Sequence, residues 1–252
     1  MLQLDNISKI FHAGTPNERI ALDGVNLHLP KGDFVTVIGG NGAGKSTLMN
    51  AISGVFLADS GRIALDGQDI TFLPEYKRAR HIGRLFQDPM KGSAPGMTIA
   101  ENLALAYKHT SGIGFQVGIG KKLQSIFREK LAQLELGLED RLKTKLGLLS
   151  GGQRQAVTLL MATICTPKLL MLDEHTAALD PTTGEKVLRL TQDIVEKDNI
   201  TTIMVTHNIT SALALGNRTI MMENGKIVLD LTGDERRNMT VETLMAKFKL
   251  SV

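Results

Sequence analysis

Apolar residues alternate with polar ones, or form short continuous runs, through the first 88 residues of the chain. Alternation is typical of half-buried strands, and a short apolar run bounded by glycines is typical of a buried strand. These patterns predict strands near residues 2–7, 25–29, 34–38 and 84–87, and another at 62–70 that contains an Asp-Gly turn signal. A glycine-rich segment follows the third predicted strand, and a helical pattern then runs through Leu48 and Ile52 to Gly54.

The character of the chain changes twice after this region. From Pro89 to Cys165 the periodicity is helical and β-branched clusters are few, which predicts an inserted helical subdomain. Beyond it, apolar runs predict strands at residues 169–173, 201–206, 218–222 and 226–231, and the pattern at 182–197 predicts a helix. Strands that alternate with helices imply a parallel sheet with helices packed on its faces. We therefore expect an α/β fold without a linker between independent domains.

Composition and charge exclude few functions but favour a reducing compartment. The formal net charge is +3 and the basic residues are scattered, which is too mild to indicate nucleic acid. The nearest basic cluster, residues 76–81, is interpreted as a solvated surface segment. Cys165 is the only cysteine, so the chain has no internal disulfide and no cysteine-based metal site. The longest uncharged stretch, 199–217, is polar throughout and is not a transmembrane helix, so any work at a membrane requires a partner.

Residues 39–46 read GGNGAGKS and match the pattern G-x-x-x-x-G-K-[ST] between a predicted strand and a predicted helix. In this context the glycines allow backbone N–H groups to face a phosphate chain, Lys45 supplies charge at the β- and γ-phosphates, and the Ser46 hydroxyl is placed for Mg²⁺. A second glycine-rich stretch, residues 112–121, lacks this spacing and follows no predicted strand. We interpret it as a mobile loop.

Acidic and histidine side chains follow two of the later predicted strands. The run LLMLDE, residues 169–174, ends in two acids. In a protein with a phosphate loop, an acid at this strand end holds the magnesium shell, a role that we predict for Asp173. Glu174 then faces the position of an attacking water and is the predicted general base. His207 follows the strand at 201–206, where contacts to a γ-phosphate gather.

The stretch LSGGQRQ, residues 149–155, predicts a helix start suited to an anion. Ser150 is a favourable N-cap, and the glycines after it leave backbone N–H groups open. No lysine lies beside these residues, and the phosphate loop at 39–46 lies far away in the sequence. The chain therefore carries two predicted phosphate-binding segments.

The order of these motifs closely resembles that of the nucleotide-binding subunits of ABC transporters, over essentially the whole chain. GGNGAGKS resembles the Walker A motif, Gln87 in LFQDP the Q-loop, LSGGQ the signature, LLMLDE the Walker B motif, residues 178–180 the D-loop, and His207 the switch histidine. The resemblance implies a P-loop NTPase (RecA-like) core with a mostly parallel sheet, an N-terminal antiparallel β-subdomain and an inserted α-helical subdomain. It implies one ABC ATP-binding domain, residues 1–252, with the core in 1–88 and 166–252 and the helical signature subdomain in 89–165.

The resemblance also implies ATP and Mg²⁺ as cofactors and assigns roles to single residues. In related proteins two subunits pack head to tail, and the signature of one closes over the ATP held by the Walker A motif of the other. The expected catalytic residues are Lys45, Gln87, Glu174 and His207, and the expected surroundings of the metal are Ser46, Gln87 and Asp173. The residues expected at the nucleotide are Phe11, which would stack on adenine, Gly39, Gly40, Asn41, Gly42, Ala43, Gly44, Lys45, Ser46, Thr47, Ser150, Gly151, Gly152, Gln153 and Asp180.

The implied function is an ATPase subunit that energises solute transport, with import favoured, through a separate integral membrane permease. The expected ATPase partner is a second copy or a paralogous subunit, and a solute-binding protein is a possible further partner. No nucleic acid is expected. The permease would dock at residues 90–103, which places the chain at the cytoplasmic face of the cell membrane as a peripheral protein.

Two alternatives stay open at this point. A soluble ABC-type ATPase that acts on nucleic acid or ribosomes would have similar motifs, although such proteins tend to carry two cassettes or a long coiled coil. A P-loop kinase or GTP-binding switch is disfavoured by LSGGQ, Gln87 and His207 together. The sequence also departs from the family pattern, because His175 replaces a usual proline and Ala156 replaces a frequent arginine, with Arg154 two residues earlier. We interpret His175 as structural.

Overall fold

A six-stranded sheet forms the centre of the computed structural model, which describes residues 1–111 and 119–250. The strand order is β10-β9-β3-β8-β7-β6, and all neighbours are parallel except β9 and β10. The strands are β3 (Phe34–Gly39), β6 (Ile82–Leu85), β7 (Leu169–Asp173), β8 (Thr201–Val205), β9 (Arg218–Glu223) and β10 (Lys226–Thr232). The predicted α/β fold with a mostly parallel sheet is therefore confirmed. Most of the glycine-rich stretch at 112–121 lies outside the described residues.

A second, antiparallel sheet is built from the N-terminal part of the chain in the order β2-β1-β4-β5. Its strands are β1 (Leu2–Phe11), β2 (Arg19–Leu29), β4 (Ser60–Leu65) and β5 (Gln68–Asp69). The predicted strand at 62–70 is thus a hairpin. Its turn residues Asp66 and Gly67 both have positive φ, as an Asp-Gly hairpin turn requires.

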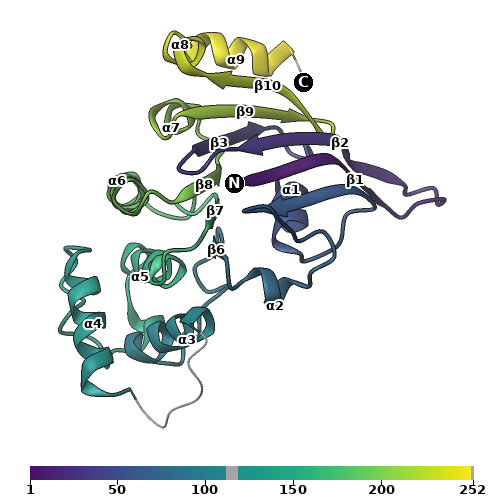
Figure 1. The fold of residues 1–252 in the computed structure, drawn as a ribbon. Coiled ribbons are helices and arrows are strands. Elements are labelled where there is room, and N and C mark those ends of the chain that lie inside the picture. Colours follow the sequence, from purple (N-terminus) through teal and green to yellow (C-terminus); the bar gives the residue numbers. More distant parts are fainter. Residues whose placement is uncertain (112–118, 251–252) are drawn as a thin grey trace.

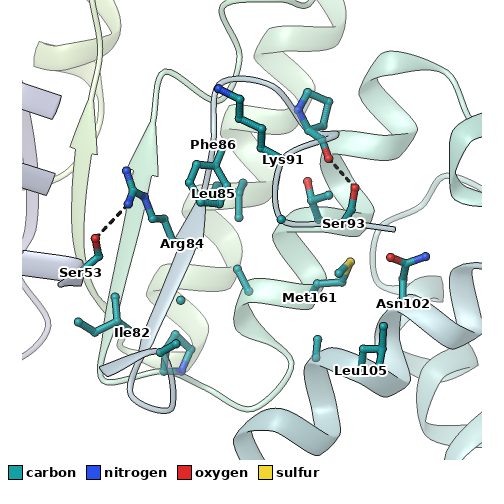
Figure 2. A pocket seen from close by; sticks show the side chains of 18 of the residues that line it. Ser53, Ile82, Arg84, Leu85, Phe86, Lys91, Ser93, Asn102, Leu105 and Met161 are labelled. Carbon is teal, nitrogen blue, oxygen red and sulfur yellow. Dashed lines mark hydrogen bonds between the residues drawn. The ribbon is translucent and has the colours of Figure 1, made fainter. Parts of the chain in front are cut away.

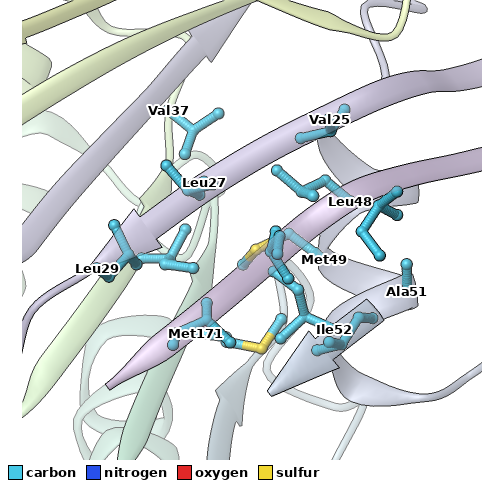
Figure 3. Close-up of a cluster of buried hydrophobic side chains, with 14 of the residues drawn as sticks. Val25, Leu27, Leu29, Val37, Leu48, Met49, Ala51, Ile52 and Met171 are labelled. Atoms are coloured by element: carbon cyan, nitrogen blue, oxygen red, sulfur yellow. The ribbon is translucent and has the colours of Figure 1, made fainter. Parts of the chain in front are cut away.

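Helix α1 (Lys45–Ser53) lies between the two sheets and forms their common core (Figure 3). Its Leu48 and Ile52 are fully buried against side chains such as Leu27 of β2 and Met171 of β7. Burial of each such side chain stabilises the fold by about 2 kcal/mol. The packing fixes the start of α1 against the end of β3.

The opposite face of the six-stranded sheet is covered by helices. Along β7, Leu169 and Met171 belong to the core with α1, whereas Leu170 and Leu172 belong to a core with α5 (Gly151–Thr163) and α6 (Pro181–Asp198). This alternation follows from the period of two in a strand, and burial on both faces explains the continuous apolar sequence. The helix predicted at 182–197 is confirmed as α6.

A separate hydrophobic core lies at one end of the molecule, where α3 (Ile99–Ser111) and α4 (Lys121–Ala132) pack beside α5 (Figure 1). It includes Phe127, Leu131 and Leu146, the last from a short 3₁₀ helix, η1 (Leu146–Leu148). This core agrees with the expected helical subdomain, although its boundaries at 89 and 165 stay a prediction. The remaining helices are α2 (Glu75–Arg78), α7 (Ile209–Ala214), α8 (Gly233–Arg237) and α9 (Val241–Leu250). Among the described residues, no helix is long and apolar enough to cross a membrane.

The interpretation of residues 76–81 as a solvated segment is wrong for Arg78, which is only 1% exposed. Its guanidinium donates to the carbonyls of Ala51 and Ile52 in the last turn of α1, at 2.7 and 2.9 Å. It also donates to the carbonyls of Leu73 and Thr71, at 2.7 and 2.9 Å. The last carbonyls of a helix lack intrahelical partners, so Arg78 caps α1 from a distant part of the chain.

Candidate functional site

The loop between β3 and α1 has a backbone shape that requires glycine. Gly39 has φ 154°, and a Cβ there would overlap the carbonyl oxygen of Met222. Gly44 has φ 104°, and a Cβ there would lie 2.7 Å from the carbonyl oxygen of Ala21. L-residues avoid these φ values, and the neighbouring backbone leaves no room for a side chain. The loop is therefore a close-packed turn that presents its backbone at the beginning of a helix.

Lys45, the first residue of α1, folds its side chain back into this loop and is 6% exposed. Its Nζ donates to the carbonyls of Gly39 at 2.7 Å and Gly40 at 3.0 Å. Burial lowers the pKa of Lys45, while the charges of Glu174 and Asp173 oppose this shift. The next residue, Ser46, is exposed. The loop thus holds a buried cation and an exposed hydroxyl side by side.

Asp173 and Glu174 lie at the carboxyl end of β7, next to β8. Asp173 has a 19% exposed side chain, and burial raises its pKa against the opposing charges of Arg84, Lys45 and His207. Glu174 leaves the strand with φ 47°, and its N–H donates to the carbonyl of Val205 at 3.0 Å. This left-handed conformation is unfavourable for a glutamate and directs its side chain away from the strand.

His207 follows β8 and brings its imidazole to Glu174. Its Nε2 lies 2.5 Å from Oε1 of Glu174, with the imidazole half exposed and the glutamate side chain 15% exposed. Because β3, β8 and β7 are parallel neighbours, their carboxyl ends meet at one edge of the sheet. The fold therefore brings Lys45, Asp173, Glu174 and His207 together from three predicted motifs.

The structure places Gln87 and Phe11 at the borders of this region. Gln87 is exposed and lies two residues beyond the end of β6, the neighbour of β7. Phe11, at the end of β1, pairs with Arg19 across the hairpin, and Arg19 Nη2 donates to the carbonyl of Gly42 at 3.1 Å. The Phe11 ring makes an edge contact with Phe56, with centroids 5.4 Å apart. The hairpin thus brings Phe11 into the neighbourhood of the phosphate loop.

The signature segment forms the predicted helix start at α5. Ser150 is the N-cap: its Oγ accepts from the N–H of Gln153, and its own N–H donates to Oε1 of Gln153, both at 3.3 Å. This reciprocal pair is a capping box. The side-chain atoms nearest to Gly151 and Gly152 belong to Leu179 and Thr183, and a Cβ at Gly152 would overlap the Thr183 methyl.

Asp180 is exposed, caps α6 and lies on the same side of the molecule's α5–α6 contact as the signature segment. Its Oδ1 accepts from the N–H of Thr183 at 3.0 Å. The hydrogen bonds from Thr183 lower the pKa of Asp180. The signature and the D-loop are therefore packed on each other within one chain, beside α6 rather than in the phosphate loop.

Three side chains near the site have contacts that sequence reasoning did not assign. Arg154 donates to the carbonyls of Leu149 at 2.9 Å and Gly147 at 3.1 Å, which ties the signature helix to the loop before it. His175 is 2% exposed, and its Nε2 lies 3.1 Å from Thr191 Oγ1. Arg84 lies beside Asp173. Only Arg154 and His175 carried a signal in the sequence, as departures from the family pattern.

The His175 environment supports the interpretation of that residue as structural. Burial lowers its pKa to about 4. The Thr191 hydroxyl already donates to the carbonyl of Val187 at 2.8 Å, so it accepts from His175. The imidazole is thus neutral and carries its proton on Nε2.

A cavity of about 740 Å³ opens between β6, α3 and α5 (Figure 2). Its wall includes Arg84 and Phe86 beside Leu105 of α3 and Met161 of α5. Residues 91–94 and Asn102, from the predicted docking segment 90–103, also line it. The cavity therefore borders both the Q-loop segment and the helices that hold the signature.

Comparison with known proteins agrees with this geometry. The family described as ABC transporter matches residues 22–177. A tyrosine transport ATP-binding protein of Clostridioides difficile (strain R20291) is 44% identical over 252 residues, covering 100% of both chains. The methionine import ATP-binding protein MetN of Streptococcus agalactiae (serotype III, strain NEM316) is 34% identical, covering 95% of this chain and 68% of the relative.

Solved structures show the same relationship. A dimeric ATP-binding cassette, solved in a post-hydrolysis state with bound ADP and Pi, has a TM-score of 0.79 and 30% identity. The similarity covers 92% of this chain and 98% of that one. These similarities support the transport ATPase over the alternative that acts on nucleic acid or ribosomes. The chain belongs to the ABC transporter family, as an ATP-binding subunit that hydrolyses ATP.

Proposed function

We propose that two ATPase subunits, either two copies of this chain or this chain with a paralogue, form composite ATP sites that drive solute import through a separate permease. The observation that carries the proposal is the division of the site residues into two groups. Lys45, Asp173, Glu174 and His207 meet at one edge of the sheet, whereas the signature at Ser150 is packed against α6. Each group supplies half of a phosphate site.

The first half fits a nucleotide with Mg²⁺. The glycine-dependent loop at Gly39, Gly40, Asn41, Gly42, Ala43, Gly44, Lys45, Ser46 and Thr47 would hold the phosphates, because its N–H groups and Lys45 complement their negative charge. Phe11 would cover the adenine. The Ser46 hydroxyl, the Asp173 carboxylate and the Gln87 amide are the oxygen donors that Mg²⁺ prefers.

The described residues contain no group of three or more His, Cys, Asp or Glu side chains able to hold a metal. At a nucleotide, Mg²⁺ would be held by few protein ligands, and phosphate and water would complete its coordination. Mg²⁺ held there would neutralise charge on the phosphates.

Hydrolysis would proceed by in-line attack of water on the γ-phosphorus. A new P–O bond forms while the bond to the β–γ bridging oxygen breaks, and ADP and phosphate leave. Glu174 would take the proton of the water, and His207, in contact with Glu174, would hold the carboxylate and bind the γ-phosphate. Lys45 would stabilise the charge that develops on the phosphate oxygens, and Gln87 would contact the attacking water.

The second half would come from the neighbouring subunit. Ser150, Gly151, Gly152 and Gln153 begin a helix, and a helix N-terminus favours an anion without the help of lysine. Asp180 would join them at the interface because it caps the helix that packs against Gly152. The dimeric cassette with ADP and Pi, to which this chain is similar, supports the pairing of two ATPase subunits.

The permease would dock in the cavity beside residues 90–103. The cavity wall carries apolar side chains, among them the exposed Leu105 and the partly exposed Phe86 and Met161, which suit the apolar face of a helix from the permease. Docking there would hold the chain at the cytoplasmic face of the membrane. The names of the relatives make tyrosine and methionine the first solutes to assay, with a solute-binding protein as the expected donor.

Purification of the tagged chain from gently solubilised native membranes, followed by mass spectrometry, tests the docking. We expect a stoichiometric multi-spanning protein to accompany the chain. The Leu105→Glu variant should lose this companion, whereas Leu148→Glu, another exposed leucine, is outside the cavity and should retain it. Recovery of the unmodified chain only in the soluble fraction, with ribosomes or nucleic acid attached, would refute the transport function.

A further inference from the structure

Arg84 links helix α1 to the carboxylate at the end of β7. It pairs with Met171 across the sheet, so its side chain lies on the same face as that of Asp173, two residues further along β7. Arg84 Nη2 lies 3.9 Å from Asp173 Oδ2. We propose that Arg84 is a positioning residue that holds Asp173 for Mg²⁺, an inference that rests on the proposed function.

The guanidinium itself is held firmly. Its Nη1 donates to Ser53 Oγ at 3.0 Å and its Nη2 to Asn50 Oδ1 at 2.7 Å, both on the last part of α1 (Figure 2 shows the contact with Ser53). Its central carbon lies 4.7 Å from the centroid of the Phe86 ring, a cation–π contact. The planar fork of arginine is suited to such simultaneous contacts, and a lysine has no equivalent geometry.

Packing alone does not explain an arginine at this position. The side chain is 12% exposed, and within the described part of the chain its Nε is buried without a hydrogen-bond partner. Burying a charge and an unpaired donor is unfavourable, and an apolar side chain of similar size would avoid both costs. An apolar side chain could make neither the hydrogen bonds to Asn50 and Ser53 nor the charge contact with Asp173, and of these only the last acts on a proposed Mg²⁺ ligand.

Arg84 contacts both elements that carry ligands of the proposed Mg²⁺ site, helix α1 with Ser46 and the end of β7 with Asp173. Ser46 lies in the first turn of α1, and Arg84 binds the same helix near its end. The attraction to Oδ2 restrains the Asp173 carboxylate, which otherwise has the cation of Lys45 as its competing neighbour. Arg84 therefore ties the carboxylate to the last part of α1.

A Mg²⁺ titration tests this role through binding rather than turnover. The full-length chain carries Glu174→Gln to suppress hydrolysis, and the binding of a fluorescent ATP analogue is followed as Mg²⁺ is added. We expect Arg84→Met to raise the Mg²⁺ concentration at half-saturation at least threefold and Arg84→Lys to raise it less. Arg80→Met removes an arginine from the same cavity without touching Asp173, and should leave the midpoint unchanged.

The Asp173→Asn variant distinguishes failure of the Arg84 inference from failure of the proposed Mg²⁺ site. If it raises the midpoint while Arg84→Met leaves the midpoint unchanged or lowers it, the Arg84 inference is overturned and the Mg²⁺ site stands. If Asp173→Asn has no effect, the proposed Mg²⁺ site fails, and the inference with it. Thermal unfolding without nucleotide reveals any folding defect of Arg84→Met, in which case the midpoint of Arg84→Lys decides.

Discussion

Glu174 and His207 form a direct contact across the sheet edge, with Glu174 Oε1 2.5 Å from His207 Nε2. The two residues follow neighbouring parallel strands, and the N–H of Glu174 is bound to the carbonyl of Val205, two residues before His207. The backbone therefore fixes both side chains relative to each other. A carboxylate held in this way suits the role of general base that we propose for Glu174.

Glu174→Gln should lower ATP hydrolysis by about 10²- to 10³-fold, because the amide keeps the shape of the side chain but cannot take a proton. ATP binding should persist, and sedimentation with ATP should show an accumulated dimer. Glu185→Gln, which removes an exposed glutamate of α6, is the matched control and should hydrolyse ATP normally. Turnover of Glu174→Gln near the unmodified rate would exclude Glu174 as the base.

Complementation between two inactive variants should reveal sites shared between subunits. Ser150→Arg blocks the signature and Lys45→Ala removes the phosphate-loop cation, so each variant alone should hydrolyse little ATP. In a mixed dimer one site combines an intact phosphate loop with an intact signature from the other copy, and ATPase activity should rise above that of either variant. If the two segments served one chain, mixing would restore nothing.

Ser150→Arg should also leave nucleotide binding by the monomer nearly intact, since the signature lies beside α6 and not in the phosphate loop. Equilibrium binding of ATP at protein concentrations too low for dimerisation checks this expectation. Loss of binding by the monomer would contradict the assignment of Ser150 to the neighbouring subunit.

The buried His175 should make the protein less stable in mild acid. Its pKa is about 4 when folded and about 6.5 when unfolded, so between these values the unfolded state binds the extra proton. The stability that neutral His175 provides is fully present above the unfolded pKa of about 6.5 and is lost as pH falls from about 6.5 to about 4. The loss in free energy of unfolding is about 2 kcal/mol at pH 5. Denaturant unfolding at several pH values should show a smaller acid loss for His175→Gln, and His12→Gln, at an exposed histidine, should keep the unmodified slope.

Arg78→Met should destabilise the fold by about 3 kcal/mol or more, because it leaves buried carbonyls of α1 and of residues 71 and 73 without a donor. Thermal unfolding measures the loss. Lys77→Met, at the exposed neighbouring position, should change the unfolding temperature little. An equally stable Arg78→Met variant would show that water replaces the lost donors.

The sequence by itself determined the features that depend on neighbouring residues. The phosphate loop at 39–46, the N-cap at Ser150 and the acids after an apolar strand at Asp173 and Glu174 are local patterns, and the structure contains each of these local features. Alternation and apolar runs located the strands because burial on one or two faces imposes these periods. The wrong interpretation of Arg78 as a solvated residue also comes from reading local sequence. A charged side chain is expected to be exposed only where no distant partner binds it.

Only the tertiary structure decided which distant residues meet. The contact of Glu174 with His207 and that of Arg84 with Asp173 both follow from the side-by-side placement of β6, β7 and β8 in the sheet, although long segments of chain separate these strands in the sequence. The burial of Arg78 likewise depends on unpaired carbonyls that α1 presents after it has packed between the two sheets. Strand order and helix packing result from the burial of the whole apolar surface, so no local pattern encodes these pairs.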